Sequence, residues 1–248
     1  MTSLLRVTTV GAVVDSVEAR GGIRVSANNV TIRRSMVDGI GGGEGAGIYI
    51  DAGISGTTIV DVEVTSRSGV TVDRAMQMDG TFSTTILRAY THNTIRGIRT
   101  GCSTTIVDSF VFGENAGNGQ HRSTVGGETC PNKPYALTVR HNHIQEAPTG
   151  VDSAALLIYP PQSAPYGPAP QQTDITLVDN ELAGGSYAMW LSSDPTFTGN
   201  LTVTGNRFRT TYFPTCGQYG QLFSDHVKTE GHFTITWSDN DGVPAPTV

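Results

Sequence analysis

The chain has 248 residues, of which 15% are charged, and its formal net charge is -6. This acidic balance disfavours a nucleic-acid partner, because affinity for nucleic acid comes mainly from Lys and Arg that neutralise phosphates. No segment has the run of apolar residues that spans a bilayer, and the first residues lack the basic and apolar regions of a signal peptide. We therefore expect a secreted, extracellular protein whose export signal was removed, or a virion-associated protein, with no nucleic-acid partner and no membrane span.

A β-branched segment, usually led by Thr-Ile or Thr-Val, recurs eight times along the chain. The segments are VTIRRSMV from Val30, TTIVDVEV from Thr57, TTILRAYT from Thr84, TTIVDSFV from Thr104, LTVRHNHI from Leu137, ITLVDNEL from Ile175, LTVTGNRF from Leu201 and FTITWSDN from Phe233. Aligned on the threonine, the position four residues later holds Ser35, Val62, Ala89, Ser109, Asn142, Asn180, Asn206 and Ser238. The mean repeat of about 29 residues is typical of stacked repeats, so we predict a single domain over residues 1–248.

A second set of short alternating runs lies between these segments. The runs start at Ile23, Ile48, Met76, Ile98, Ala155, Met189 and Leu222. Each repeat therefore holds at least two strands, separated by Gly, Ser, Asn or Asp turn residues, which is the pattern of one coil of a parallel β-helix. The sequence thus predicts an all-β fold: a single-stranded parallel β-helix, a solenoid of about eight to nine coils.

The alternation also predicts which side chains fill the core. Those expected to point inward are Ile23, Val25, Ile48, Ile50, Met76, Met78, Ile98, Met189 and Leu191. Asn142, Asn180 and Asn206 share one aligned position, so we expect their amides to stack in an internal ladder with a structural role. His141 and His143 flank a ladder asparagine, and with no third ligand visible we assign them to packing rather than to a metal site.

The spacing of the aligned positions is uneven. Ala89 and Ser109 are 20 residues apart, whereas 33 residues separate Ser109 from Asn142. We expect the extra residues to form loop insertions at about 113–134 and 159–174 on one face, where repeat proteins often bind their ligands. The first insertion should also hide a short strand around residues 123–125.

Three cysteines, Cys102, Cys130 and Cys216, lack the CxxC spacing of a zinc site. One interpretation is a single disulfide that includes Cys130, which lies in the Gly-rich first insertion, together with one buried thiol. Either Cys102 or Cys216 can be the partner in that disulfide. The other interpretation is three buried thiols in a reducing compartment.

The Thr-Ile and Thr-Val strands with their polar column, the Gly-rich turns and the chain end WSDNDGVPAP resemble the right-handed parallel β-helix superfamily of pectate-lyase-like proteins. The resemblance is greatest to small bacterial and phage-associated β-helix proteins and covers about residues 13–237. It implies a right-handed coil and a polysaccharide that lies along one parallel sheet. The catalytic motifs of the best-known branches are absent, so the resemblance assigns no catalytic residue.

The outward positions of one predicted sheet supply the candidate site. For the runs that start at Ile23, Ile48, Met76 and Ile98, the outward residues are Arg24, Tyr49, Gln77 and Arg99, and a row two residues on contains Asp51 and Asp79. We predict that the catalytic residues are Tyr49, Asp51, Asp79, Arg99, His121 and Arg122. We predict that the substrate-binding residues are Arg24, Gln77, Arg96, Tyr159 and Trp190.

These residue types fit β-elimination on an acidic polysaccharide, which needs a cation on the substrate carboxylate, a base and a proton donor. In this scheme Arg99 and Arg122 neutralise the carboxylate. His121 or an arginine then takes the proton of the substrate, and Tyr49 protonates the leaving oxygen. We therefore predict a polysaccharide-binding protein that acts as a polysaccharide lyase.

Alternative roles remain open for the same residues. Asp51 and Asp79 could bind calcium, the one cofactor that the sequence suggests, act as acid and base of a glycoside hydrolase, or simply be turn residues. Arg99 could pair with Asp79, and His121 could be an ordinary surface residue.

A non-enzymatic function is also open. The chain could be a phage tail or surface β-helix that binds glycan or assembles, and both a monomer and a homotrimer fit. Trp190, together with Leu156 and Phe223 on the same outward row, would then form a subunit contact rather than a platform on which sugars stack.

Overall fold

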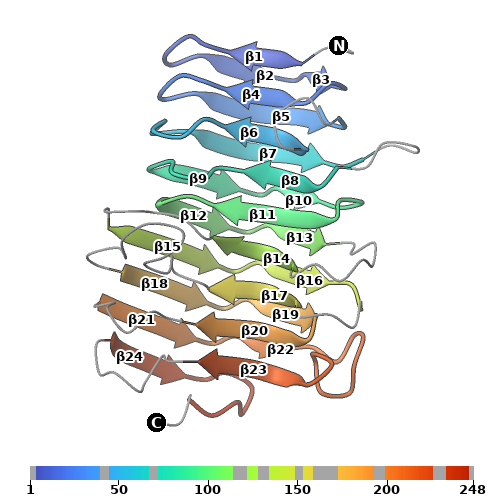
Figure 1. Ribbon diagram of the computed structural model, residues 1–248, viewed down its shortest axis with the longest axis vertical. Helices are drawn as coiled ribbons and strands as arrows, with labels where there is room; N and C mark the ends of the chain where they lie inside the picture. The colour runs from blue at the N-terminus through green and yellow to red at the C-terminus, as the bar shows by residue number, and fades with distance from the viewer. Residues whose placement is uncertain are drawn as a thin grey trace.

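The computed structural model describes residues 4–39, 45–66, 72–113, 122–127, 134–148, 153–158, 173–192, 199–225 and 233–245. Within these ranges the chain is all-β, without a helix, and its strands form two sheets (Figure 1). Sheet A contains β1 (Leu5–Val7), β4 (Ile23–Val25), β6 (Ala46–Ile50), β8 (Arg74–Gln77), β11 (Arg96–Thr100), β14 (Arg122–Gly127), β17 (Ser153–Ile158), β20 (Tyr187–Ser192) and β23 (Gly220–Asp225).

Sheet B has more strands than sheet A, fifteen in all. They are β2 (Val13–Asp15), β3 (Glu18–Ala19), β5 (Thr31–Val37), β7 (Thr58–Val64), β9 (Thr84–Leu87), β10 (Tyr90–Thr91), β12 (Ser103–Val107), β13 (Phe110–Gly113), β15 (Tyr135–Arg140), β16 (His143–Glu146), β18 (Thr173–Val178), β19 (Glu181–Gly184), β21 (Gly199–Thr204), β22 (Arg207–Phe208) and β24 (Phe233–Ser238). Both predicted sets of strands are confirmed. The Thr-led segments lie in sheet B, and the second set lies in sheet A, where β14 covers the strand expected around residues 123–125.

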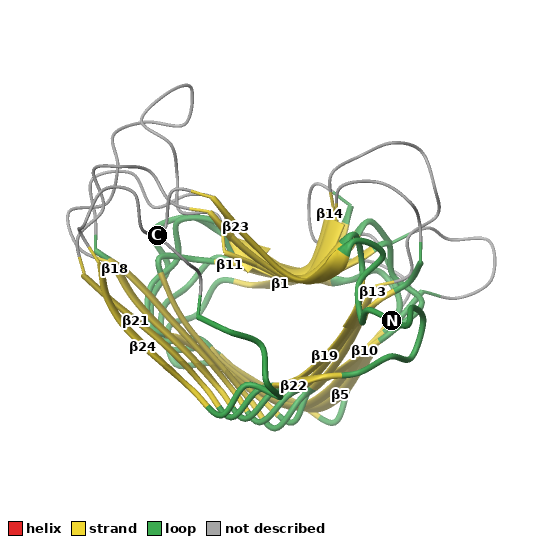
Figure 2. Cartoon of the chain, turned by 90° about the horizontal axis from the view of Figure 1, so that it is seen from below, coloured by secondary structure: helices red, strands yellow, loops and turns green. Residues whose placement is uncertain are grey.

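The chain alternates between the two sheets, and neighbouring strands of each sheet run parallel to one another. Seen along the stack, the sheets face each other across one core (Figure 2). We call one passage through both sheets a coil. This arrangement is compatible with the predicted parallel β-helix. The structure also adds a first coil, whose strand β2 has no leading threonine and was missed in the sequence.

Sheet B bends at one corner in every coil, and the residue at the bend has a positive φ. These residues, which we call the corner row, are Ser16, Arg34, Asp61, Arg88, Asp108, His141, Asp179, Gly205 and Asp239, with φ between 47° and 70°. The left-handed backbone conformation is disfavoured for most L-residues but is accessible to Gly and Asp, which supply five of the nine positions. The residue that follows each corner points into the core.

The predicted asparagine ladder occupies this inward position. The side-chain amide of Asn142 donates to Asn180 Oδ1 at 3.0 Å, and that of Asn180 donates to Asn206 Oδ1 at 2.9 Å. The alignment that places Ser238 at the end of this column is wrong. Thr236, not Thr234, lies in register with Thr202, and this shift of two residues makes Asn240 the last ladder residue, where it accepts from Asn206 at 3.0 Å.

The core is built largely as the alternation predicts. All nine predicted inward residues of sheet A have at most 1% of their surface exposed. Sheet A departs from strict alternation at one level, however, because consecutive residues such as Ala75 and Met76, or Ala155 and Leu156, both enter the core. The prediction that Leu156 faces outward is therefore wrong, and Leu157 takes the position beside Trp190 on the outer face.

The cysteines follow the first of the two interpretations. Cys102 is disulfide-bonded, Cys216 is a buried free thiol, and Cys130 lies outside the described residues. Burial raises the pKa of the Cys216 thiol to about 12, so this thiol stays protonated and unreactive at neutral pH. Most of the two predicted insertions also lies outside the described residues. Within those residues, no helix of a length and apolarity suited to crossing a membrane is present.

Candidate functional site

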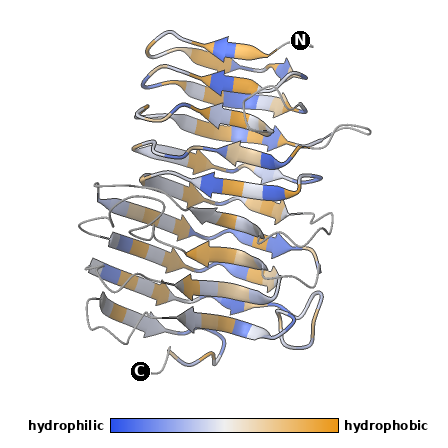
Figure 3. Cartoon of the chain, viewed as in Figure 1, coloured by the Kyte–Doolittle hydropathy of each residue, from blue (hydrophilic) through white to orange (hydrophobic). Residues whose placement is uncertain are grey.

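The outer face of sheet A carries one continuous row of side chains in register. In coil order the row contains Arg6, Arg24, Tyr49, Gln77, Arg99, Gly126, Leu157, Trp190 and Phe223. Parallel strands lie about 4.8 Å apart, so neighbouring side chains of the row lie within contact distance of one another, except at Gly126, which has none. The row divides into a polar N-terminal half and an apolar C-terminal half, and the hydrophilic colour of β1, β4, β8 and β11 shows this division (Figure 3).

Two aspartates of the polar half are held by arginines. Arg24 Nη2 lies 2.8 Å from Asp51 Oδ1, and Ser26 Oγ donates to the other oxygen of Asp51. Arg99 Nε lies 2.6 Å from Asp79 Oδ1, and Gln77 Nε2 donates to Asp79 Oδ2 at 2.9 Å. The pairing of Arg99 with Asp79, which the sequence left open, is thus present. Both oxygens of both carboxylates are already hydrogen-bonded by side chains of the protein.

A third arginine lies beside this pair and was missed in the sequence. Arg74 Nη1 donates to Gln77 Oε1 at 2.8 Å, and Arg74 and Arg96 both approach Asp73, at 3.3 and 3.9 Å. Burial lowers the pKa of Arg74, and the nearby positive charges of Arg96 and Arg99 lower it further. We call Arg24, Arg74, Arg96 and Arg99 the arginine cluster. With Arg6 on the same row, this face carries five guanidinium groups and the three carboxylates of Asp51, Asp73 and Asp79, which gives this part of an acidic protein a net positive charge.

Tyr49 lies inside this cluster. Its ring lies 5.2 Å from Arg24 Cζ, in cation–π contact, and in the sheet it is the partner of Gln77. The structure therefore brings most of the predicted site residues onto one face. They are Arg24, Tyr49, Asp51, Gln77, Asp79, Arg96 and Arg99. His121 and Tyr159 lie outside the described residues, as does the side chain of Arg122, which begins β14.

The apolar half of the row is a cluster of aromatic rings. We call Tyr187, Trp190, Tyr219 and Phe223 the aromatic patch. The ring centroids of Trp190 and Phe223 are 4.3 Å apart, and the ring of Tyr187 contacts the other three at centroid distances of 5.3 to 6.0 Å. Tyr219 is 60% exposed. Trp190 lies three strands beyond Arg99 in sheet A, so the predicted substrate-binding residues extend over both halves.

The predicted calcium site does not fit the arrangement of its two aspartates. Calcium takes six to eight oxygen ligands, whereas the oxygens of Asp51 and Asp79 are already engaged by arginine, serine and glutamine side chains. Across the described ranges, no group of three or more His, Cys, Asp or Glu side chains is placed to hold a metal ion.

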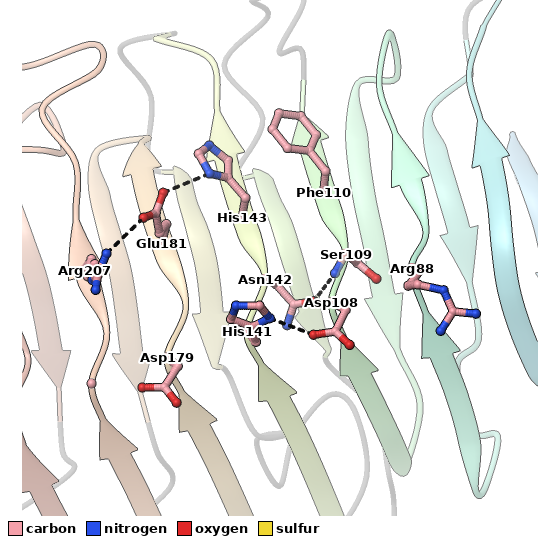
Figure 4. Close-up of a pocket in the computed structure, with 11 residues that line it drawn as sticks. Arg88, Asp108, Ser109, Phe110, His141, Asn142, His143, Asp179, Glu181 and Arg207 are labelled. Atoms are coloured by element: carbon pink, nitrogen blue, oxygen red, sulfur yellow. Dashed lines mark hydrogen bonds and ion pairs between the residues drawn. The ribbon is translucent and has the colours of Figure 1, made fainter.

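A separate groove lies at the corner of sheet B and was not predicted (Figure 4). Its volume is about 830 Å³, and it is lined by Arg88, Asp108, Ser109, Phe110, His141, Asn142, His143, Asp179, Glu181, Gly205 and Arg207. His141 Nδ1 lies 2.7 Å from Asp108 Oδ1, and His143 Nδ1 lies 3.1 Å from Glu181 Oε2. The two histidines do flank ladder residue Asn142, as predicted, but their rings face this groove.

The sequence does hold a signal for this groove. The position two residues after six consecutive corners, from Asp61 to Gly205, contains Glu63, Tyr90, Phe110, His143, Glu181 and Arg207, which pair in that order along sheet B. The aligned column therefore places three flat rings next to one another. The column one residue after the inward position therefore identifies these side chains in the sequence.

Comparisons of the chain with protein-family models, with curated proteins and with solved structures found no match.

Proposed function

We propose that the chain is a right-handed, single-stranded parallel β-helix of the pectate-lyase-like kind, with about eight to nine coils. The regular alternation between two parallel sheets supports this proposal, since each connection between neighbouring parallel strands has to cross the other sheet. Crossover connections between parallel strands are right-handed in nearly all proteins. The resemblance of the Thr-led repeats and their turns to that superfamily points the same way.

We propose that the outer face of sheet A binds an acidic polysaccharide. The observation that carries the proposal is the arginine cluster, in which Arg74, Arg96 and Arg99 lie close enough for their charges to repel. Guanidinium groups bind carboxylates through pairs of parallel hydrogen bonds. The row continues into the aromatic patch, on which sugar rings can stack. A chain of uronic acid units along the sheet would meet both surfaces.

We propose β-elimination as the reaction on this face. Arg99 and its neighbours would neutralise the substrate carboxylate, which makes the adjacent C–H acidic, and Tyr49 would protonate the leaving oxygen. His121 or an arginine would act as the base, and Arg122 would assist in neutralisation. The hydrolase alternative is weaker, because Asp51 and Asp79 would first have to release the side chains that occupy all four of their oxygens.

The test is to incubate the protein with polygalacturonate, alginate and hyaluronan and to follow the ultraviolet absorbance of an unsaturated product. We expect absorbance to rise with at least one of them, and Tyr49→Phe to abolish cleavage while binding persists. Arg96→Ala should weaken binding about ten-fold, the loss of one charge-assisted contact, whereas Arg33→Ala on sheet B should not. Release of reducing ends without absorbance would establish hydrolysis instead, and failure of every polymer to bind would refute the proposal.

We propose that the protein works outside the cell or as part of a virion. The disulfide of Cys102 supports this location, because disulfides persist mainly in oxidising environments. The non-enzymatic alternative is a glycan-binding monomer or homotrimer in which the aromatic patch lies between subunits. Sedimentation equilibrium tests the homotrimer. A trimer that Trp190→Lys converts to a monomer would favour assembly through the aromatic patch.

A further inference from the structure

We propose that the groove at the corner of sheet B is a second carbohydrate site, specific for uncharged sugar units. It lies across the core from the face of sheet A (Figure 2) and rests on different residues, so it stands independently of the function proposed for that face. Its volume of about 830 Å³ lies within the range of small-ligand pockets. Three features of the groove support this proposal: a ring platform, polar groups directed into the groove, and the sign of its charge.

The platform is a set of stacked rings held in fixed orientation. The rings of Phe110 and His143 are stacked, with centroids 4.8 Å apart and planes 12° from parallel. Tyr90 contacts the edge of Phe110 at 5.4 Å and stacks on His92 at 4.2 Å. Tyr90 is 44% exposed and Phe110 36%. Exposed aromatic rings contribute less to stability than buried ones, because the hydrophobic gain depends on the apolar area removed from water. Because these rings pack against one another at the strand spacing, they expose their edges, and together they form a rigid apolar ridge against which the C–H groups of a sugar ring can pack.

The polar groups around the platform provide both acceptors and donors. Asp179 lines the groove, and within the described part of the chain its carboxylate has neither a hydrogen bond nor an ion pair (Figure 4). The next corner residue is Gly205, where a Cβ atom would lie 2.2 Å from Asp179 Oδ1. Glycine at this position thus leaves room for the carboxylate. Arg207, whose side chain is 61% exposed, supplies donors.

His141 adds a second acceptor. Its side chain is 74% exposed, and its Nδ1 faces the carboxylate of Asp108. A carboxylate at Nδ1 favours the tautomer that carries its proton there, which leaves Nε2 as an acceptor. Hydroxyl groups both donate and accept hydrogen bonds, so a polyhydroxylated ring matches this mixture of groups better than an apolar ligand or a simple ion.

The charge of the groove decides between neutral and acidic sugars. Its lining contains three carboxylates, of Asp108, Asp179 and Glu181, and two guanidinium groups, of Arg88 and Arg207. Arg88 is already bound by both oxygens of Asp61. Glu181 is in turn bound by Arg209. Counted with these two partners, the groove still holds four carboxylates against three guanidinium groups, so its negative charge disfavours a uronic acid, whereas the arginine cluster of sheet A attracts one. The two sites accordingly suit different units of a mixed polysaccharide, or two different glycans.

The test is an NMR titration of the isotope-labelled protein with cellohexaose, maltohexaose and mannohexaose, followed on the ring signals of His141 and His143. We expect at least one hexasaccharide to shift both signals at millimolar concentration. Phe110→Ala should weaken that binding at least ten-fold and Asp179→Asn should weaken it clearly, whereas Phe110→Tyr keeps the ring and should bind normally. Asp239→Asn is the matched control, because Asp239 belongs to the corner row but not to the groove lining.

The outcomes are decisive in both directions. If none of the three hexasaccharides shifts the histidine signals, or if the shifts persist in Phe110→Ala, the groove is not a sugar site. If oligogalacturonate shifts the same signals instead, the assignment to uncharged sugars is wrong. Arg96→Ala should leave binding in this groove unchanged, so failure here and failure of the function proposed for sheet A can be told apart.

Discussion

The corner of sheet B is held together differently in the two halves of the molecule. In the N-terminal coils the inward position holds Val17, Ser35, Val62, Ala89 and Ser109, and the corner row outside it is ion-paired. Asp15 binds Arg33 and Arg34, and Arg88 binds Asp61 with two hydrogen bonds of 2.6 and 2.9 Å. In the C-terminal coils the inward position is always asparagine, and no ion pair involves Asp179 or Asp239 among the described residues.

This difference shows that the same backbone corner can be stabilised by hydrogen bonds on its core side or by ion pairs on its solvent side. Hydrogen bonds in the buried ladder act in a medium of low dielectric constant and are strong, whereas exposed ion pairs contribute little and are screened by salt. The C-terminal corner therefore depends little on its outward residues. Asp179 is consequently available to line a groove, beside His141, whose ring contacts Asp108. In these coils the structural role of the corner row has passed to the asparagines behind it.

The largest effect should come from breaking the asparagine ladder. Asn180 Oδ1 accepts from the backbone N–H and the side-chain amide of Asn142, and its own amide donates to Val139 O at 2.8 Å. Asn180→Ala leaves these buried groups without partners, so we expect it to lower the free energy of unfolding by about 2 to 4 kcal/mol. Urea denaturation measures the change, and a loss below about 1 kcal/mol would show that the ladder is dispensable.

A smaller effect is expected from Ser109, the last ladder position before the asparagines. Its hydroxyl donates to Val107 O at 2.9 Å and accepts from the Ala89 N–H at 3.0 Å. Ser109→Ala removes one donor and one acceptor without a large cavity, so we expect a loss of about 1 kcal/mol. If this loss equalled that of Asn180→Ala, the two halves of the corner would not differ in the way we describe.

The exposed ion pairs should matter less than either ladder residue. Asp61→Asn weakens the contact with Arg88 on the outside of the corner, and we expect a loss of stability smaller than that of Ser109→Ala. The loss should disappear in about 1 M salt, where charges are screened within about 3 Å. Asp239→Asn, on the same row, should have no measurable effect at any salt concentration. Thermal unfolding at two ionic strengths tests both statements.

The smallest effect should be a loss of protection against hydrogen exchange in acid, confined to the corner of the N-terminal coils. The hydrogen bond from Arg34 lowers the pKa of Asp15 to about 2, below its value of about 4 in the unfolded chain. A lowered carboxyl pKa stabilises the folded state above the unfolded pKa, and the contribution is lost as the pH falls from about 4 to about 2. The protection factor of the Val17 amide against hydrogen exchange should then fall, whereas that of the Asn206 amide should not. Asp15→Asn should remove this pH dependence.

Much of the fold could be predicted from the sequence, because each coil repeats the same local physics. Alternating β-branched residues identify the strands, and the recurring Asn and Ser identify the inward corner position. The last coil was misaligned since Thr234 and Thr236 both fit the pattern, and only the pairing of Thr236 with Thr202 distinguishes them. The first coil was missed because Val13, Val14 and Asp15 form too short a strand to stand out.

The site was predicted less completely than the fold. Arg24, Tyr49, Gln77 and Arg99 were placed correctly beside one another because they share one level of the alternation. Arg74 was missed because Ala75 and Met76 both enter the core. Strict alternation counted back from Met76 would turn Arg74 inward, whereas its side chain lies on the outer face. The partners of each aspartate could not be predicted either, because several hydrogen-bond donors lie within a few ångströms of each carboxylate and the sequence does not distinguish among them.

The corner also makes each coil a unit that can be removed. Every coil contributes one left-handed residue followed by one inward residue, so deleting residues 89–108 would join Arg88 to Ser109 and recreate the same pair at the junction. The shortened molecule would lose a single rung of about 4.8 Å in height, together with Cys102, while the rungs on either side closed the gap. A chain with this architecture can therefore change its length in whole steps by duplication or loss of one rung.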